Sequence, residues 1–158
     1  MKKSSLIGVL LLGTSLVFGQ SAKKLKGEVI ANVEAEKANL IEVSDKIWAA
    51  AEIAFQEKVS SKTLIDYAKA NGFTVEEGVA ETPTAFVATY GSGKPVIGIL
   101  GEFDALPGIS QKASPKKEPL VPGGAGHGCG HNMFGTASLG AAVAVKKLIE
   151  QGKIKGTV

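Results

Sequence analysis

The chain has 158 residues, enough for one compact domain with its own core, and its apolar and charged fractions are those of an ordinary globular protein. All 18 basic residues are lysines, against 15 acidic residues, and this near balance is not the electrostatic footprint of a nucleic-acid-binding protein. The lack of arginine in the sequence also removes the side chain that usually holds a carboxylate or phosphate by two parallel hydrogen bonds.

The first 19 residues have the layout of a secretory signal peptide. Two lysines precede an apolar run over residues 6–18, and small residues follow that run. The run is too short to span a bilayer comfortably, which argues against a membrane anchor. We therefore expect cleavage between Gly19 and Gln20, and a secreted, periplasmic protein that has no membrane association after cleavage.

Apolar spacing predicts two helices after the signal peptide. Residues 23–56 carry large apolar side chains at helical spacing, and most charged residues lie off that stripe. A second helix is predicted from about Ser61 to Asn71, and Gly72 is well placed to end it. Alternation of apolar and polar residues over 73–79 predicts a short strand.

The most strand-like part of the sequence covers residues 84–108. We predict strands at 86–90 and 96–100, joined by a hairpin turn at GSGKP. The second strand is apolar on both faces, as a central strand would be. Glu102 and Asp104 follow its carboxyl end, where sites form in open α/β sheets. Asp104 could equally be a turn residue, and the position of Glu102 gives no specific support for a role as a base.

A last helix is predicted from Asn132, which can cap it, to about Gln151. The small residues of GTASLGAAVAV would let this helix pack closely on a sheet. Gly152 can end this helix, and residues 152–158, GKIKGTV, look like the start of another strand.

Residues 127–131, His-Gly-Cys-Gly-His, hold both histidines of the chain and its only cysteine. In an extended segment, His127, Cys129 and His131 would point to one side, and thiolate and imidazole are the preferred ligands of zinc. A carboxylate such as Asp104 could hold a metal-bound histidine in its ligating tautomer. A nucleophilic Cys–His pair and an ordinary glycine-rich turn are the two other interpretations.

The stretches GILGEFDALPG and GAGHGCGHNMFGTASLGAA together resemble the amidohydrolase branch of the dinuclear zinc peptidases, which includes N-acyl-amino-acid and auxin-conjugate hydrolases. The residues before DALP and the asparagine after the histidine motif are similar to those of the aminobenzoyl-glutamate hydrolases within that branch. The resemblance runs from about residue 40 to the end. It implies an α/β fold, a zinc-exopeptidase-like three-layer sandwich with a mixed, mainly parallel sheet, here truncated.

The resemblance also implies roles for individual residues. Cys129 and His131 match the metal ligands of the family, Asp104 matches a supporting residue near the metals, and the role of His127 stays open. The cofactor implied is a pair of divalent ions, zinc or, as an alternative, manganese. The catalytic glutamate is expected beyond the strand that begins at the end of the chain. Residues 20–158 are therefore expected to be the N-terminal part of a catalytic domain, without its lid or dimerisation domain.

The activity implied is metal-dependent cleavage of N-acyl or N-aroyl amino acids such as p-aminobenzoyl-glutamate, so the expected partner is a small-molecule amide. We expect this chain to be inactive by itself, and full-length relatives to be dimeric. The alternative from another class is a non-catalytic, secreted module that binds a metal or a peptide, and a thiol hydrolase is a third.

Overall fold

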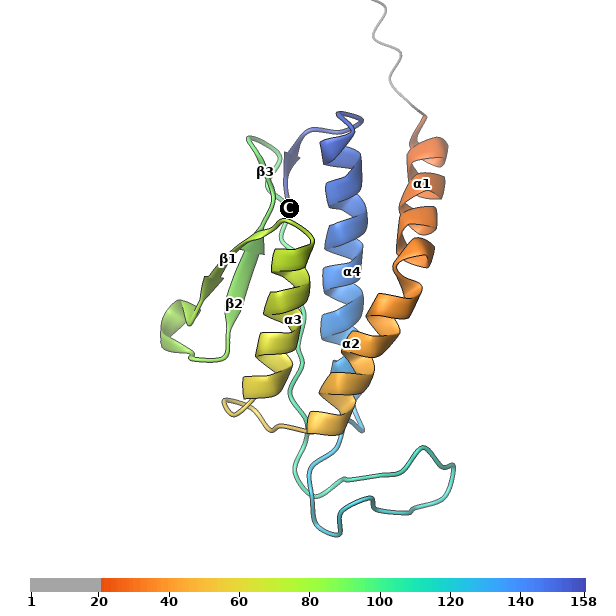
Figure 1. Ribbon diagram of the computed structural model, residues 1–158, viewed down its shortest axis with the longest axis vertical. Helices are drawn as coiled ribbons and strands as arrows, with labels where there is room; N and C mark the ends of the chain where they lie inside the picture. The colour runs from red at the N-terminus through yellow and green to blue at the C-terminus, as the bar shows by residue number, and fades with distance from the viewer. Residues whose placement is uncertain (1–20) are drawn as a thin grey trace, which may run out of the picture.

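The computed structural model describes residues 21–158, and the predicted signal peptide at residues 1–19 lies outside that range. Within this range four helices stand beside one another with α4 in the middle, and two of the strands, β1 and β2, lie on the far side of α3 (Figure 1). Helix α4 contacts each of the other three helices. The helices are α1 (Ala22–Ala35), α2 (Lys37–Ala50), α3 (Lys58–Ala70) and α4 (His131–Glu150).

The single helix predicted over residues 23–56 is in fact two helices that meet at Glu36. The Glu36 carboxylate accepts hydrogen bonds from Lys147 on α4, at 2.7 Å, and from the Tyr67 hydroxyl on α3, at 3.2 Å. The prediction was also wrong about the end of the helix, because Ala51 adopts the left-handed conformation and stops α2 there. The junction at Glu36 carries contacts to two other helices, and apolar spacing does not encode such contacts.

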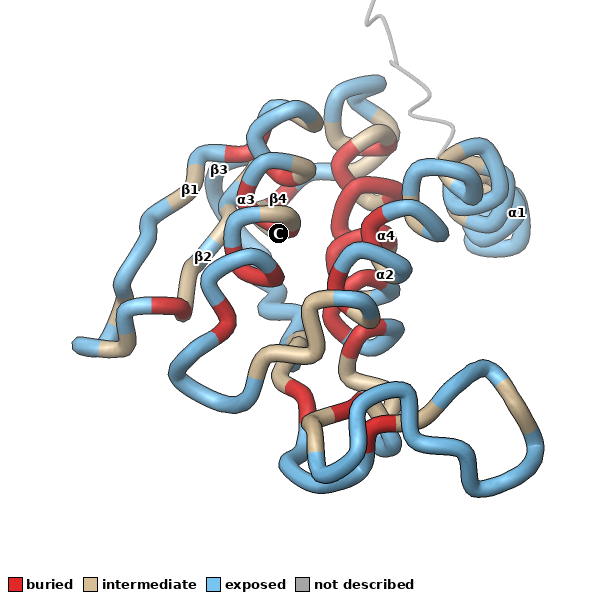
Figure 2. The backbone as a smooth tube through the Cα atoms, turned by 60° about the horizontal axis from the view of Figure 1, so that its bottom comes forward, coloured by how far each residue is buried: buried red, intermediate tan, exposed pale blue. Residues whose placement is uncertain are grey.

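The core lies where α4 faces α2 and α3. Figure 2 shows buried residues concentrated along α4. Ile47, Leu64 and Val143 are fully buried and contribute one side chain from each of these three helices. The small residues of α4 allow close approach, but at Gly140 the neighbour is helix α2 and not the predicted sheet: a Cβ added there would lie 2.9 Å from the side chain of Leu40.

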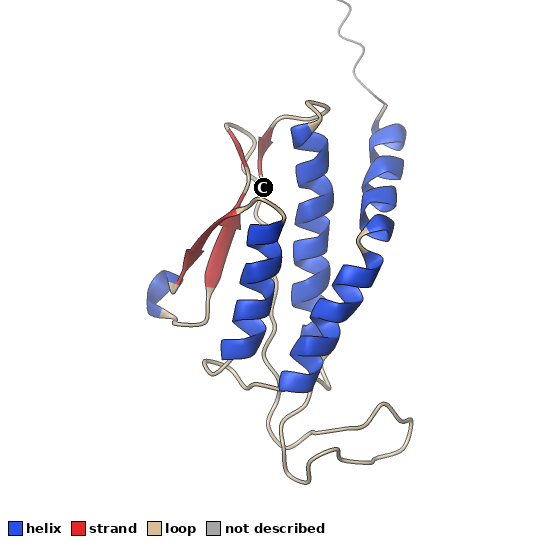
Figure 3. Ribbon diagram, viewed as in Figure 1, coloured by secondary structure: helices blue, strands red, loops and turns tan. Residues whose placement is uncertain are grey.

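Two short antiparallel ladders make up the strands, drawn in red in Figure 3. Strand β1 (Thr74–Glu77) pairs with β2 (Phe86–Thr89), and β3 (Gly91–Ser92) pairs with β4 (Gly156–Thr157). A single turn of 3-10 helix, Val79–Glu81, lies between β1 and β2. Parallel pairing occurs as isolated bridges, such as that between Val96 and Thr157. Helices and parallel and antiparallel strand pairs together bear out the predicted α/β class.

The predicted hairpin between residues 86–90 and 96–100 is wrong. The end of the chain comes between the two segments: Val158 exchanges hydrogen bonds of 2.8 and 3.0 Å with Tyr90, and the Thr157 carbonyl accepts from the Ile97 amide at 2.9 Å. Residues 96–101 run beside α4 without a ladder of their own. Each of the two segments therefore pairs with residues 157–158, which are distant in sequence, and not with the neighbouring segment that the turn residues predicted.

The predicted cap at Asn132 is also wrong. Helix α4 begins one residue earlier, and Gly130, with a φ of 86°, precedes it. The buried Asn132 side chain instead donates a 3.0 Å hydrogen bond to the Ser44 hydroxyl, which ties α4 to α2. Among the helices that the structure describes, none combines the length and the apolar character needed to cross a bilayer.

Candidate metal centre

Three side chains gather at the first turn of α4. Glu102, Asp104 and His131 each present one donor atom, and the three atoms lie within 4.8 Å of one another. His131 is the first residue of α4, and the two carboxylates come from the segment that passes this turn. The structure thus brings together two of the predicted site residues, Asp104 and His131, and adds Glu102.

A close backbone contact holds this arrangement in place. A Cβ added at Gly135 would lie 2.7 Å from the backbone oxygen of Glu102, so only glycine allows α4 to come this near. His131 and Gly135 are four residues apart and share one face of the helix. The face that approaches residues 101–103 therefore carries His131 to the two carboxylates.

Backbone hydrogen bonds fix the turn that follows Asp104. The Ala105 amide donates to the Glu52 carbonyl at 2.7 Å, in the loop after α2. Leu106 and Gly126 exchange two bonds of 3.0 Å, which join this turn to the glycine-rich loop before α4. Asp104 and His131 are thus attached to the same small frame, although 27 positions separate them.

Both ring nitrogens of His131 face a carboxylate. Nδ1 lies 2.8 Å from an Asp104 oxygen, and Nε2 lies 3.1 Å from a Glu102 oxygen. A neutral imidazole has a single N–H, so it can donate to one of these carboxylates only. If Nδ1 donates to Asp104, the lone pair of Nε2 faces the oxygen of Glu102. A proton or a metal ion between these two atoms would satisfy both.

The donor set fits a divalent metal ion. Imidazole nitrogen and carboxylate oxygen are common ligands of zinc and of other first-row divalent ions. The side chain of His131 is 17% exposed and that of Asp104 22%, whereas that of Glu102 is 47% exposed. The cluster is therefore shielded on the Asp104 side and open to solvent on the Glu102 side, where a further ligand or a substrate has room.

The rest of the motif does not converge on this cluster, contrary to the expectation for an extended segment. The chain turns at residues 128–130, where the Gly130 amide donates to the His127 carbonyl at 3.1 Å. Cys129 is exposed on this turn, and its sulfur is not one of the clustered donor atoms. Among residues 21–158, no hydrogen bond joins Cys129 to either histidine, so no contact supports a nucleophilic Cys–His pair.

His127 turns toward α2 instead. Its Nε2 lies 3.1 Å from the Ile47 carbonyl, which can only accept, so Nε2 carries the hydrogen. Its Nδ1 is buried and has no hydrogen-bond partner among the described residues. Burial lowers the pKa of His127, outweighing the opposing effect of the bond to Ile47. The neutral side chain of His127 therefore joins the glycine-rich loop to the last turn of α2 by a hydrogen bond.

The contacts of two acidic residues near the site, Glu102 and Glu52, could not be predicted from the sequence. Glu102 had no specific support, because nothing in the sequence shows that it faces the ring of His131. Glu52 accepts the backbone amides of Val59 and Ser60, both at 2.9 Å, at the start of α3. Burial would raise the pKa of Glu52, but these hydrogen bonds outweigh it and keep the pKa below its ordinary value. Its place in AEIAFQEKVSS, a few residues before a helix, was the available signal.

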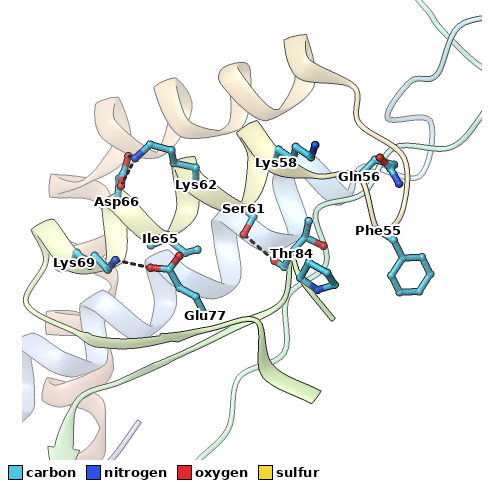
Figure 4. A pocket seen from close by; sticks show the side chains of 11 residues that line it. Phe55, Gln56, Lys58, Ser61, Lys62, Ile65, Asp66, Lys69, Glu77 and Thr84 are labelled. Carbon is cyan, nitrogen blue, oxygen red and sulfur yellow. Dashed lines mark hydrogen bonds and ion pairs between the residues drawn. The ribbon is translucent and has the colours of Figure 1, made fainter. Parts of the chain in front are cut away.

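A groove along α3 provides a contrast to the cluster. Figure 4 shows that Phe55 at its end points outward and that two ion pairs, Lys62–Asp66 and Lys69–Glu77, lie along it. Lys62 binds Asp66 at 2.7 Å, and Lys69 binds Glu77 at 2.6 Å. Exposed pairs of this kind are common on solvated surfaces. None of the three clustered residues lines this groove.

The sequence and the structure of the chain are similar to those of known hydrolases. No family model matches the chain. Over 127 residues the chain is 46% identical to a p-aminobenzoyl-glutamate hydrolase component from Escherichia coli (strain K12), covering 80% of this chain and 26% of that protein. It is 30% identical over 110 residues to thermostable carboxypeptidase 2 of Saccharolobus solfataricus, covering 68% of this chain and 27% of that protein.

A solved structure agrees with these relatives. The crystal structure of an aminohydrolase from methicillin-resistant Staphylococcus aureus matches with a TM-score of 0.68 and 25% identity, covering 84% of this chain and 33% of the other. The chain thus spans about a quarter to a third of the length of the proteins it matches. The resemblance predicted from the two sequence motifs is confirmed: the chain is a relative of the amidohydrolases and peptidases that these proteins represent.

Proposed function

We propose that Glu102, Asp104 and His131 belong to the metal centre of an amidohydrolase that cleaves N-acyl or N-aroyl amino acids, with p-aminobenzoyl-glutamate as the leading substrate. The observation that carries the proposal is the 2.8 Å contact between Asp104 and Nδ1 of His131. A carboxylate in that position fixes the tautomer and the orientation of a histidine that binds metal through Nε2. The name of the Escherichia coli relative supports the substrate class.

Cys129 is proposed as a further ligand. It is the only cysteine in the chain, it is exposed, and it lies two residues before His131, on the turn that leads into α4. Thiolate and imidazole together suit zinc, and manganese is the alternative where carboxylates dominate the ligand set. Glu102, the most exposed of the three side chains, would help to hold the ion from the side of the site that is open to solvent.

The residues of this chain bind and orient, and the bound metal ions supply the remaining chemistry. Two divalent ions would lower the pKa of a bound water and polarise the scissile amide carbonyl. Asp104 keeps the Nδ1 proton of His131 in place, and the frame around Ala105 and Gly126 holds both side chains at a fixed spacing. The glutamate expected to accept the proton of the water is proposed to lie in the part of the family's length that this chain does not span.

Metal analysis of purified protein tests the site. We expect the wild-type chain to bind zinc, and we expect His131→Ala and Cys129→Ala to lose most of that binding. Glu76→Gln is the matched control, because it removes a charge from β1, away from the cluster. Equal metal content in wild type and both site variants would contradict the assignment.

Substrate assays test the reaction separately. We expect no metal-dependent release of glutamate from p-aminobenzoyl-glutamate by the 158-residue chain, and release once the remaining family length is present. Metal binding without hydrolysis by the longer protein would favour the non-catalytic binding module. The secreted, periplasmic location is part of the same proposal and would be tested by export of the chain with residues 1–19 attached.

A further inference from the structure

A pocket of about 410 Å³, called here the α2-end pocket, lies between the end of α2 and the base of the loop over residues 107–126. Figure 1 shows this loop beyond the end of α2. One wall consists of residues 48–51, at the end of the helix, and the other of residues 110–113, 120–121 and 124–128. Pockets of this size hold small organic molecules.

The α2-end pocket adjoins the proposed metal centre. On the helix side, the wall ends at Ala51, and the carbonyl of the next residue, Glu52, accepts the Ala105 amide at 2.7 Å. Ala105 follows Asp104 directly. On the loop side, the wall ends one residue before Cys129. A molecule held at the metals can therefore extend one end into this pocket.

The end of α2 presents three backbone carbonyls that have no partner. The Ala51 amide donates to the Ile47 carbonyl, and the chain then leaves the helix. Among the described residues, no hydrogen bond reaches the carbonyls of Trp48, Ala49 or Ala50. The last carbonyls of a helix point along its axis and form the negative end of its dipole. The pocket therefore offers acceptors for N–H groups.

Two side chains narrow the class of ligand further. Trp48 is half-buried and gives the pocket an aromatic surface, against which another ring can pack. Lys112 is the one charged side chain among the described residues that line the pocket, and its positive charge disfavours a cation there. Backbone carbonyls cannot donate a hydrogen bond to a carboxylate. These features together favour a neutral aromatic amine, whose ring suits Trp48 and whose N–H groups suit the carbonyls.

We infer that the α2-end pocket receives the aminophenyl ring of the substrate, and that the carbonyls at the end of α2 accept hydrogen bonds from its amino group. This inference rests on the proposed function, in which p-aminobenzoyl-glutamate is the leading substrate. Its ring is attached to the carbonyl carbon of the scissile amide, so an amide held at the metals leaves the ring for the adjoining pocket. The amino group, at the opposite end of the ring, is then directed away from the metals. The pocket thus selects an aminobenzoyl group over other aroyl groups.

A pair of matched ligands tests the hydrogen bonds in the metal-free 158-residue chain. Trp48 is the only tryptophan, so its indole N–H gives a single signal in a proton–nitrogen NMR spectrum. We expect p-aminobenzoyl-glutamate to shift this signal and the amides of residues 49–51. Its dissociation constant should be about fivefold lower than that of p-methylbenzoyl-glutamate, because a methyl group cannot donate the hydrogen bond.

Two substitutions test the side chains of the pocket. Trp48→Leu keeps an apolar side chain but removes the aromatic surface, so we expect both ligands to bind about fivefold more weakly, as read from the amides of residues 49–51. Lys112→Gln should leave the preference for the amino ligand over the methyl ligand unchanged, because an arylamine is neutral. Lys117→Gln, on the same exposed loop, is the matched control for the loss of charge.

Three results would overturn the inference. Equal dissociation constants for the amino and methyl ligands, or no shift at about 10 mM of either, would show that the pocket does not recognise an arylamine. Equally strong shifts with N-acetyl-glutamate, which has no ring, would show that the glutamate end enters instead. Shifts confined to residues outside the pocket would place the ligand elsewhere. Because these titrations contain no metal, their failure would leave the metal analysis of His131 and Cys129 unaffected.

Discussion

The two histidines of residues 127–131 stand four positions apart, yet they lie in two different regions. His131 opens α4 and has a carboxylate at each ring nitrogen. His127 lies against the last turn of α2, with one nitrogen on a backbone carbonyl and the other buried without a partner among the described residues. The turn at Gly130 separates them. The chemistry of a histidine is thus decided by the elements that its backbone reaches, rather than by its place in a motif.

The strongest test of this difference is loss of metal. We expect His131→Ala to weaken divalent metal binding by more than about 100-fold, because loss of a supporting residue alone costs about 10–100-fold. His127→Ala should bind metal within about threefold of wild type, since its ring faces Ile47. Isothermal titration with zinc measures both. A His127→Ala variant that lost metal as fully as His131→Ala would remove the distinction.

The two carboxylates beside His131 should differ in the same assay. Asp104→Asn keeps the shape of the side chain but can no longer accept strongly from Nδ1, so we expect zinc affinity to fall by about 10–100-fold. Glu102→Gln should cost less, because the more exposed side chain of Glu102 can be replaced by water at the site. An equal loss in both variants would show that the carboxylates act as equivalent ligands.

The other histidine should matter for stability. We expect His127→Ala to lower the free energy of unfolding of the metal-free protein by about 1 kcal/mol, the usual value of one hydrogen bond. Denaturant titration provides the measurement, with Lys117→Ala on the exposed loop as the control. No change relative to that control would mean that the bond to Ile47 contributes nothing to the fold.

The smallest expected effect is a pH dependence. The pKa of His127 is lowered in the folded chain, so the unfolded chain binds its proton more readily. Stability should therefore fall as the pH drops below about 6.5, the ordinary histidine pKa, until the folded pKa is reached. Because His127 binds a single proton, its removal can change the slope of the free energy of unfolding against pH by at most about 1.4 kcal/mol per pH unit. His127→Ala should show a shallower decline over this window.

Much of the helical part of the fold followed from the sequence, because its apolar stripes are local and periodic. The existence of α3 and α4 was predicted correctly, with ends within a few residues. Glu36, at the break, bonds to Lys147 and Tyr67, and Asn132, the predicted cap, bonds to Ser44; all three partners come from other elements. A one-dimensional pattern does not contain those partners.

The strand region and the site were predictable only in part for the same reason. Residues 96–100 were expected to pair with their neighbours in sequence, but the end of the chain bonds to both segments instead. Asp104 and His131 carried enough motif information to be named in advance. Glu102 did not, because its contact with Nε2 depends on how closely α4 approaches at Gly135.

The exposed position of Cys129 has a practical consequence. Because the chain has one thiol, a maleimide-linked fluorophore or nitroxide spin label would attach at a single, known point. That point is two residues from His131, so the label would report from within the first turns around the site. Competition between zinc and the labelling reagent would turn the rate of labelling into a direct reading of site occupancy, without any substrate.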